Sequence, residues 1–450
     1  MSPTEDPSSG PAVTVVGIDA AGRPAHPGLA EALATAGLVV GAARHLAAVP
    51  VPPGCVTVAL GPLAPALDAL RAAVAAGHQA VVLASGDPGF FGIVRRLRAA
   101  GLPLRVLPAV SSVAAAFARA GLPWDGAVVV SAHGRDLRPA LNTCRALPAV
   151  AVLTAPGAGA AELGAGLVGW PRQLVVAELL GTPDERTTWI TPEDAAGRRW
   201  VDPHVLLSLA PTVAGPTGGG RLAGLADAAD LADVAGGGAA GAGGTAAAGE
   251  VTGVGVGPVR ADNQPAAAPV GGWALPESAY AHRDSMITKA EVRALAVARL
   301  RPRLGRLVWD IGAGSGSVGI ECALLGAAVI AVERDPQAPV RANAARHGVD
   351  VRLVTGHAPE ALRGLPDPDA VFVGGGGTDV LAAVAERRPD RVVVTLAALD
   401  RVAPAVHLLR DAGYAVEGSQ LAAARLADLP GGSMRLAATN PVVVLTGERR

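Results

Sequence analysis

The chain has 450 residues, of which 50% are hydrophobic and 17% are charged, and its formal net charge is −1. This length predicts two or three domains. The balanced charge argues against a nucleic-acid-binding protein, which would carry basic patches. The first ten residues are unlike a signal peptide, and strongly apolar runs are short, so we expect a cytoplasmic protein that does not span a membrane. The three cysteines are too far apart to indicate disulfides or a zinc site, and we expect no bound metal.

The composition changes sharply between residues 211 and 272, where glycine and alanine dominate. Such a segment buries too little side-chain surface to offset its ordering entropy, so we predict a flexible linker. Within it, residues 221–234 have leucine and alanine at helical spacing, which predicts one short helix. The linker separates a first half (13–210) from a second half (273–450), and residues 1–12 are expected to form a disordered tail.

Both halves alternate short apolar runs with helical stretches, which predicts an α/β fold with βαβ units and largely parallel sheets. In the first half, the predicted strands are 13–18, 80–84, 104–107, 128–131, 150–153, 174–177 and 205–209. In the second half they are 307–310, 328–332, 351–354, 370–373 and 392–395, and then, with no helix between them, 415–421 and 442–446.

A glycine-rich turn follows the first predicted strand of the second half. Residues 308–316 read VWDIGAGSG, and the next strand ends at Glu333. Glycines in such a turn allow positive φ angles and close approach of the backbone to a ligand. A carboxylate at the end of the next strand can accept hydrogen bonds from both hydroxyls of a ribose. Because an ordinary tight turn needs only one glycine, the pattern predicts a nucleotide-type site.

Two ligands are candidates for this site. Gly314, Gly316 and Gly319 fit the dinucleotide pattern, so an NAD(P)-dependent oxidoreductase is one hypothesis. The strand, however, runs directly into Gly312, which puts the dinucleotide pattern two residues late. Asp310 ends the strand, where a carboxylate would attract the cationic end of S-adenosylmethionine and repel a pyrophosphate. The sequence therefore favours the methyl donor.

Five stretches of the second half, 285–294, 310–321, 331–334, 356–360 and 373–377, together resemble the decarboxylating precorrin methyltransferase domains of corrin synthesis. That resemblance implies a class I Rossmann-like methyltransferase with a seven-stranded sheet. It implies S-adenosylmethionine contacts from Thr288, Asp310, Gly312, Ala313, Gly314, Ser315, Gly316, Glu333, Gly356 and Ala358. The substrate would be an acidic tetrapyrrole, for which His282, Arg283 and Arg435 are candidate carboxylate-binding residues. Each of these three, taken singly, is more typical of a solvated surface.

The first half has a different set of motifs. Residues 84–92 read ASGDPGFFG after one predicted strand, and residues 108–112 read PAVSS after the next. Taken alone, Ser-Gly-Asp-Pro is an ordinary turn, in which Asp87 would cap a helix beginning near Phe90. With residues 16–18, 129–134 and 178–186, however, these motifs resemble the tetrapyrrole methylases in order and spacing.

Tetrapyrrole methylases have two α/β lobes with S-adenosylmethionine folded into the cleft between them. The resemblance implies donor contacts from Ser85, Gly86, Asp87, Pro88, Ser111 and Ser112. It also implies that the loop with Gly17, Asp19 and Gly22 faces the macrocycle. Many relatives have Gly-x-Gly in this loop, and Asp19 is a departure from it.

Two donor-type motif sets in one chain resemble the fused precorrin-6Y methyltransferases. The resemblance implies one S-adenosylmethionine site per half, methylation at C5 and C15, and loss of CO₂ from the ring C acetate to give precorrin-8X. Such methylation needs mainly alignment of donor and acceptor. Since related C-terminal domains form homo-oligomers, we expect an oligomer. A binding or scaffold protein with a degenerate first half, motivated by Asp19, is a third hypothesis.

Overall fold

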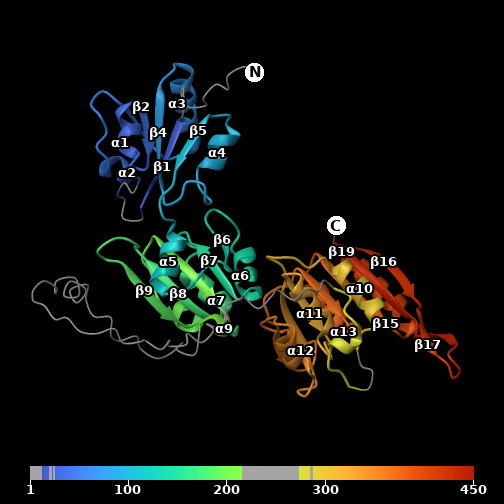
Figure 1. Cartoon of the computed structure of the whole chain (residues 1–450). Coiled ribbons are helices and arrows are strands. Elements are labelled where there is room, and N and C mark those ends of the chain that lie inside the picture. Colours follow the sequence, from blue (N-terminus) through green and yellow to red (C-terminus); the bar gives the residue numbers. More distant parts are fainter. Residues whose placement is uncertain (1–12, 20–22, 24–25, 215–272, 284–286, 450) are drawn as a thin grey trace, which may run out of the picture.

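The computed structural model describes residues 13–19, 23, 26–214, 273–283 and 287–449 (Figure 1). The predicted tail, the linker from residue 215 onward and the predicted helix over 221–234 lie outside these residues. Within them, the first half folds into two lobes and the second half into one domain. None of the described helices is long and apolar enough to cross a membrane.

The first lobe is a five-stranded parallel sheet in the order β3-β2-β4-β1-β5. Its central strands are apolar along almost their whole length because helices cover both faces. Its strands are β1 (Val13–Ile18), β2 (Ala36–Gly41), β3 (Val56–Ala59), β4 (Gln79–Ser85) and β5 (Leu104–Leu107). Its helices are α1 (Leu29–Ala34), α2 (Ala43–Ala48), α3 (Leu63–Ala75) and α4 (Val94–Ala99).

The second lobe has the strand order β6-β7-β10-β8-β9, in which only β6 and β7 are parallel. The expectation of a largely parallel sheet is wrong here, because a short turn joins β8 to β9 and β10 inserts between β7 and β8. Its strands are β6 (Val128–Ser131), β7 (Ala149–Leu153), β8 (Gln173–Glu178), β9 (Arg186–Ile190) and β10 (His204–Leu209). Its helices are α5 (Ser112–Ala120), α6 (Leu137–Ala146), α7 (Ala160–Leu167), α8 (Pro192–Ala196) and α9 (Pro211–Ala214).

The second half contains the predicted seven-stranded sheet, in the order β13-β12-β11-β14-β15-β19-β16, in which β19 is antiparallel to both neighbours. A two-stranded hairpin, β17–β18, which the sequence did not predict, projects from it (Figure 1). The strands are β11 (Leu307–Ile311), β12 (Ala328–Glu333), β13 (Arg352–Thr355), β14 (Ala370–Val373), β15 (Arg391–Leu396), β16 (Tyr414–Leu421), β17 (Ala424–Asp428), β18 (Met434–Ala438) and β19 (Val442–Arg449). The helices are η1 (Glu277–Ala279), α10 (Ala290–Leu300), α11 (Ser317–Leu324), α12 (Val340–Arg346), η2 (Glu360–Leu362), α13 (Thr378–Glu386), η3 (Leu399–Arg401) and α14 (Val402–Asp411).

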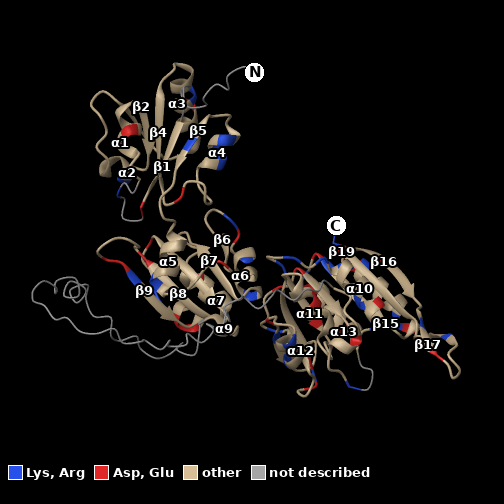
Figure 2. Ribbon diagram, in the orientation of Figure 1, with Lys and Arg blue, Asp and Glu red and all other residues tan. Residues whose placement is uncertain are grey.

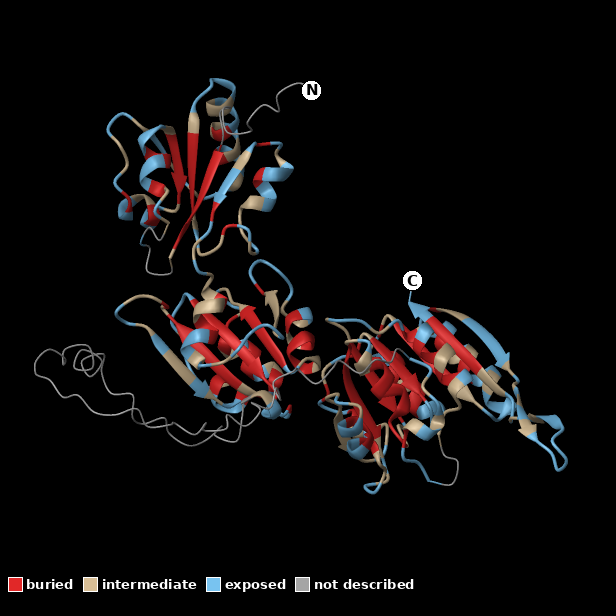
Figure 3. Ribbon diagram, in the orientation of Figure 1, coloured by how far each residue is buried: buried red, intermediate tan, exposed pale blue. Residues whose placement is uncertain are grey.

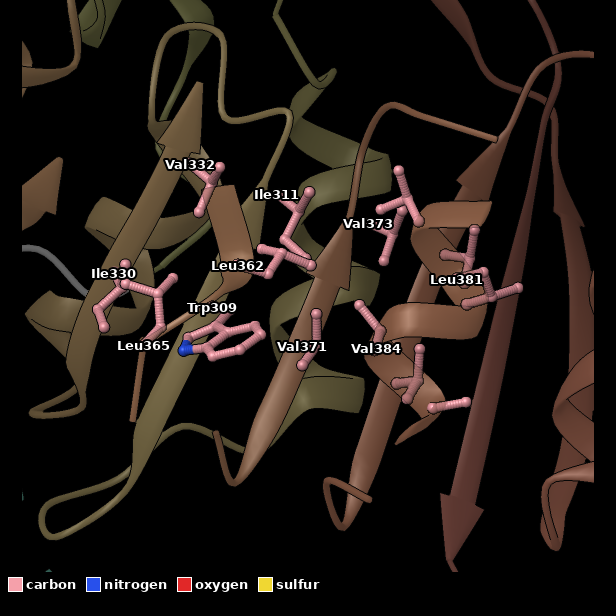
Figure 4. Close-up of a cluster of buried hydrophobic side chains, with 14 of the residues drawn as sticks. Trp309, Ile311, Ile330, Val332, Leu362, Leu365, Val371, Val373, Leu381 and Val384 are labelled. Atoms are coloured by element: carbon pink, nitrogen blue, oxygen red, sulfur yellow. The ribbon is translucent and has the colours of Figure 1, made fainter. Parts of the chain in front are cut away.

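Buried residues are concentrated in the sheets (Figure 3), and charged residues lie mainly on helices and loops (Figure 2). One face of the second half's sheet packs against α13 and α14, with Trp309 lying between Leu365 and Val371 (Figure 4). Between β13 and β14, however, the chain forms only the single turn η2 instead of an α-helix. The domain's own helices therefore leave part of this face uncovered.

The second lobe fills that gap. Trp170, which follows α7, is 4% exposed and packs into the core that contains Trp309, and the face of its ring meets the Arg352 guanidinium at 5.9 Å. Polar groups flank this contact: Asn142 of α6 donates to the Gly305 carbonyl at 3.0 Å. The Arg172 side chain is fully buried and pairs with Asp350 at 2.9 Å. The two halves thus share a packed interface along α6 (Figure 1).

Candidate active site

A cavity of about 1150 Å³ opens at the carboxyl ends of the parallel strands of the second half. This edge is where open α/β sheets bind their ligands. Most of the donor residues predicted for this half line the cavity, and they come from separate loops: Thr288, Gly312, Ala313, Gly314, Ser315, Glu333, Gly356 and Ala358. The structure therefore brings these residues together. Asp310 and Gly316 are not among the lining residues.

The loop after β11 requires its alternating glycines. Gly312, Gly314 and Gly316 have φ angles of 71°, 54° and 74°, a region that other residues rarely adopt. A Cβ atom on Gly312 would lie 2.9 Å from the backbone nitrogen of Gly375, so the loop also passes close to the turn after β14. The result is a wall of exposed backbone that a ligand can approach closely.

Glu333 at the end of β12 holds this loop in place. Its Oε2 accepts a hydrogen bond from the Gly314 amide at 2.7 Å, and its Oε1 accepts one from the Asp335 amide at 3.0 Å. A carboxylate has about four lone-pair positions, so accepting capacity remains on the side facing the cavity. Glu333 is therefore placed both to shape the loop and to accept hydrogen bonds from ligand hydroxyls.

Asp310 lies beneath the glycine loop and not on the cavity wall. It is 1% exposed, and its Oδ2 accepts a hydrogen bond from the Gly319 amide at 2.8 Å. Its Oδ1 is buried, and no group in the described residues donates to it. Burial raises the pKa of Asp310 to about 7, although the Gly319 hydrogen bond opposes the shift; the nearby Glu333 charge adds to it. The carboxylate thus supports the start of α11 and acts on the cavity only through the loop.

A buried ion pair fixes the segment that carries Thr288. Arg293 of α10 and Glu321 of α11 have no exposed side-chain area and meet at 2.6 Å. Arg293 also donates to the Thr288 carbonyl at 2.6 Å, while Glu321 accepts from the Ala274 and Leu275 amides at 2.9 and 3.0 Å. Neither charged residue was predicted to have this role. The available signal was one charged residue on the otherwise apolar inward face of each of the two helices.

The three predicted carboxylate-binding residues are placed differently. Arg283 lines the cavity and pairs with Asp335 at 2.9 Å. His282 and Arg435 are exposed and are not among the lining residues. Several polar residues that line the cavity were not predicted as site residues: Lys289, His357, Asp379, Thr395 and Asn440.

In the first half, the loops after β1, β4 and β5 converge. A Cβ atom on Gly17 would lie 2.3 Å from the Gly86 carbonyl oxygen and 2.4 Å from the Ala109 nitrogen, so only glycine allows this packing. A Cβ on Gly86 would lie 3.5 Å from the Cα of Ser111. The predicted donor stretches 85–88 and 111–112 are therefore neighbours, and Gly17 packs the loops together.

Side chains of these loops are held by local hydrogen bonds. Ser85 accepts from the Arg44 guanidinium at 3.0 Å, and its Oγ lies 3.1 Å from Nε2 of His45. Burial, and then the Arg44 charge, lower the pKa of His45, which favours the neutral ring. Asp87 accepts from the Gly89 amide at 2.8 Å and so caps a turn, because α4 begins only at Val94.

Ser111 and Ser112 stand at the start of α5. Ser111 is its N-cap residue, and its Oγ accepts a hydrogen bond from the Ala114 amide at 3.1 Å. Ser112 is the first residue of the helix. Both are half-buried beside the turn that contains Gly86.

Asp19, the residue that departs from the Gly-x-Gly of many relatives, organises the loop after β1. It accepts from the Arg23 amide at 2.7 Å and pairs with the Arg23 guanidinium at 3.0 Å. Arg23 also donates to the Gly181 carbonyl of the second lobe at 3.3 Å. Asp19 therefore contributes to a link between the lobes. Gly22 lies outside the described residues.

Comparisons with known proteins match two separate stretches of the chain. A model of tetrapyrrole (corrin/porphyrin) methylases matches residues 27–196, and a model of the precorrin methyltransferase domain matches residues 278–446. A Sinorhizobium protein described as precorrin-6Y C(5,15)-methyltransferase [decarboxylating] is 37% identical over 67% of this chain; the alignment covers 63% of that relative, a little under two thirds of its length.

Shorter relatives also match. A Pyrobaculum calidifontis protein, "Probable cobalt-precorrin-6B C(15)-methyltransferase (decarboxylating)", is 36% identical over 38% of this chain and 94% of its own length. The crystal structure of a Geobacter metallireducens precorrin-6y C5,15-methyltransferase is 35% identical, covers 40% of this chain and 97% of its own, and has a TM-score of 0.37. These matches give the oxidoreductase hypothesis no support. The chain belongs to the decarboxylating precorrin methyltransferases, a family of S-adenosylmethionine-dependent enzymes.

Proposed function

We propose that the chain methylates precorrin-6Y at C5 and C15 and removes CO₂ from its ring C acetate, giving precorrin-8X. The observation that carries this proposal is the presence of two unrelated loop clusters in one chain, each at the carboxyl ends of parallel strands. One is the glycine loop beside Glu333, and the other is the convergence of the loops at Gly17, Gly86 and Ser111. The printed description of the Sinorhizobium relative supports the same pair of methylations.

Each half would bind one S-adenosylmethionine, whose sulfonium supplies an activated methyl group. In the second half, the glycine loop fits a donor because its backbone lines the cavity and is held in place by Glu333. Thr288, Gly356 and Ala358 line the rest of that wall. In the first half, residues 85–88 and 111–112 form the corresponding surface. The protein's own contribution to methyl transfer is then alignment of the donor with the macrocycle and exclusion of water.

The two halves would divide the reaction. Relatives named for C15 methylation with decarboxylation match only 38% of this chain, about the length of the second half. We therefore assign C15 methylation and decarboxylation to the second half and C5 methylation to the first. A cytoplasmic location stays a prediction.

The direct test incubates the purified chain with precorrin-6Y and methyl-labelled S-adenosylmethionine. The proposal expects two labelled methyl groups and one released CO₂ per product. Equilibrium binding provides the control against an oxidoreductase, since S-adenosylhomocysteine should bind and NADH should not. Absence of label transfer, or label without CO₂, would contradict the proposal.

We also propose a homo-oligomer. The β17–β18 hairpin carries an apolar face in which Leu426 pairs with Leu436 across the strands, and these side chains are 70% and 67% exposed. Met434 on the same face is 62% exposed. Such a contiguous apolar surface is typical of an interaction site. Light scattering should report an oligomer that Leu426→Asp dissociates, whereas a strictly monomeric wild-type chain would contradict the proposal.

A further inference from the structure

The chain contains one lysine. Of its 38 lysine and arginine residues, only Lys289 is lysine. Lys289 directly precedes α10 and lines the cavity beside the glycine loop. Because arginine supplies the positive charge at every other such position, a lysine here points to a property that arginine lacks.

Charge alone does not explain the choice. A carboxylate of the substrate is better held by arginine, whose planar guanidinium can form two parallel hydrogen bonds with it. The guanidinium, however, stays protonated in proteins, whereas an ammonium group can release a proton and recover it from water. The property that distinguishes lysine at this position is therefore proton transfer.

The surroundings of Lys289 leave its ammonium available. The residue is half-buried, and no group in the described part of the chain pairs with its side chain. Two carboxylates that line the same cavity have other partners: Glu333 accepts from backbone amides, and Asp335 pairs with Arg283. The ammonium is thus free to meet a ligand in the same cavity as the donor loop.

We infer that Lys289 is the proton donor of the decarboxylation, an inference that rests on the proposed function. The bond between the acetate methylene carbon and its carboxylate breaks, CO₂ leaves, and the electron pair passes into the conjugated macrocycle. The pair then returns to the methylene carbon, which uses it to bind one proton from Nζ of Lys289 and becomes a methyl group. The neutral amine then recovers a proton from water at the cavity mouth. Electrons and atoms balance without an oxidant or a further cofactor.

His357 is a rival proton donor. It also lines the cavity, on the loop after β13, and an imidazole exchanges protons near neutral pH. It is exposed, while Lys289 is half-buried and adjoins Thr288, which belongs to the segment held by the buried Arg293. This fixed position favours Lys289, because a proton donor must be held against the carbon that it protonates.

The test uses the full-length chain, precorrin-6Y and labelled S-adenosylmethionine, and counts methyl groups and decarboxylation in the product by mass spectrometry. Lys289→Met removes the ammonium, and Lys289→Arg keeps the charge but not the releasable proton. Arg341→Met is the matched control, since Arg341 is exposed on α12 outside the cavity. His357→Gln tests the rival, and calorimetry with S-adenosylhomocysteine follows donor binding in every variant.

Both Lys289 variants should form the decarboxylated product at least about 100-fold more slowly, as expected for loss of a general acid. Methyl transfer and donor affinity should stay within about threefold of wild type. Three results would overturn the inference. Lys289→Arg could restore decarboxylation, or the Lys289 variants could lose methyl transfer or donor binding as strongly as decarboxylation. The third is a selective loss of decarboxylation in His357→Gln instead of in the Lys289 variants. A wild-type chain that neither methylates nor decarboxylates would instead refute the proposed function.

Discussion

The interface between the halves can be tested by cutting the chain. A specific protease site placed within residues 236–247, inside the predicted linker, is used to cut the chain after folding. Trp170 is 4% exposed and sits on the face of the second half's sheet that lacks an α-helix of its own. Because this contact does not depend on the linker, we expect the cleaved wild-type halves to stay together. Trp170→Ala should separate them.

The expected loss of affinity between the halves follows from the burial of Trp170. Truncating a buried tryptophan to alanine costs about 3–5 kcal/mol in a packed core. Since each 1.4 kcal/mol is a factor of ten in an equilibrium constant, affinity between the cleaved halves should fall by roughly 100- to 4000-fold. This range is an upper estimate, because Trp170 also contacts Arg145 of its own half.

Gel filtration of the cleaved chain at micromolar concentration is the assay. Trp189→Ala is the matched control, because Trp189 on β9 is 39% exposed and belongs to neither the interface nor its core. Wild type and Trp189→Ala should elute as one complex, and Trp170→Ala as two separate halves. Cleaved wild-type halves that separate at once, or Trp170→Ala halves that co-elute as tightly as wild type, would refute the packing described here.

Three further predictions concern the second half. Arg293→Met or Glu321→Leu should each lower the free energy of unfolding in urea by about 3–5 kcal/mol, because each single change leaves a buried charge without its partner. The double variant should lose clearly less than the sum of the two single losses. Additive losses would argue against a coupled ion pair. Asp310 has a raised pKa, so the folded chain keeps a proton that the unfolded chain loses between about pH 4 and pH 7. The unfolding temperature should therefore fall as pH rises through this window, and Asp310→Asn should make this fall smaller. An equal fall in the variant would count against the raised pKa of Asp310. Gly312→Ala should abolish donor binding in this half, as measured by calorimetry. Gly364→Ala is the control, because Gly364 has a similar φ of 74° but lies in open space, and this change should leave donor binding intact. Equal losses in both variants would show that backbone strain alone causes the loss of binding.

The sequence predicted most of the buried strands, because a strand covered on both faces is a continuous apolar run. It missed β2, an interior strand whose last four residues are buried, and β9, an edge strand of the second lobe. The first strand, 13–18, and the strand over 370–373 match β1 and β14 at both ends. Strand β3 was missed because it is a four-residue edge strand whose side chains are mostly exposed, which removes the apolar signal. The antiparallel order of the second lobe was missed because it depends on where β10 inserts, which local pattern does not encode.

The site also combines features that follow from local sequence with features that depend on how distant elements pack. The glycine loop was predictable because a positive φ angle, as at Gly312 and Gly314, favours glycine at that same position in the sequence. The place of Asp310 was not recognised, although alternation along β11 puts it on the same face as Val308, toward α11 and away from the cavity. The link between Arg293 and Glu321 joins two helices and has no local signature beyond one charged residue on the apolar inward face of each helix.

The central claim is that one chain holds two methyl-donor sites in two unrelated folds. Titration calorimetry of the intact chain with S-adenosylhomocysteine measures this directly. We predict two equivalents bound per chain, falling to one in Gly312→Ala. A wild-type stoichiometry of one or zero would contradict the account.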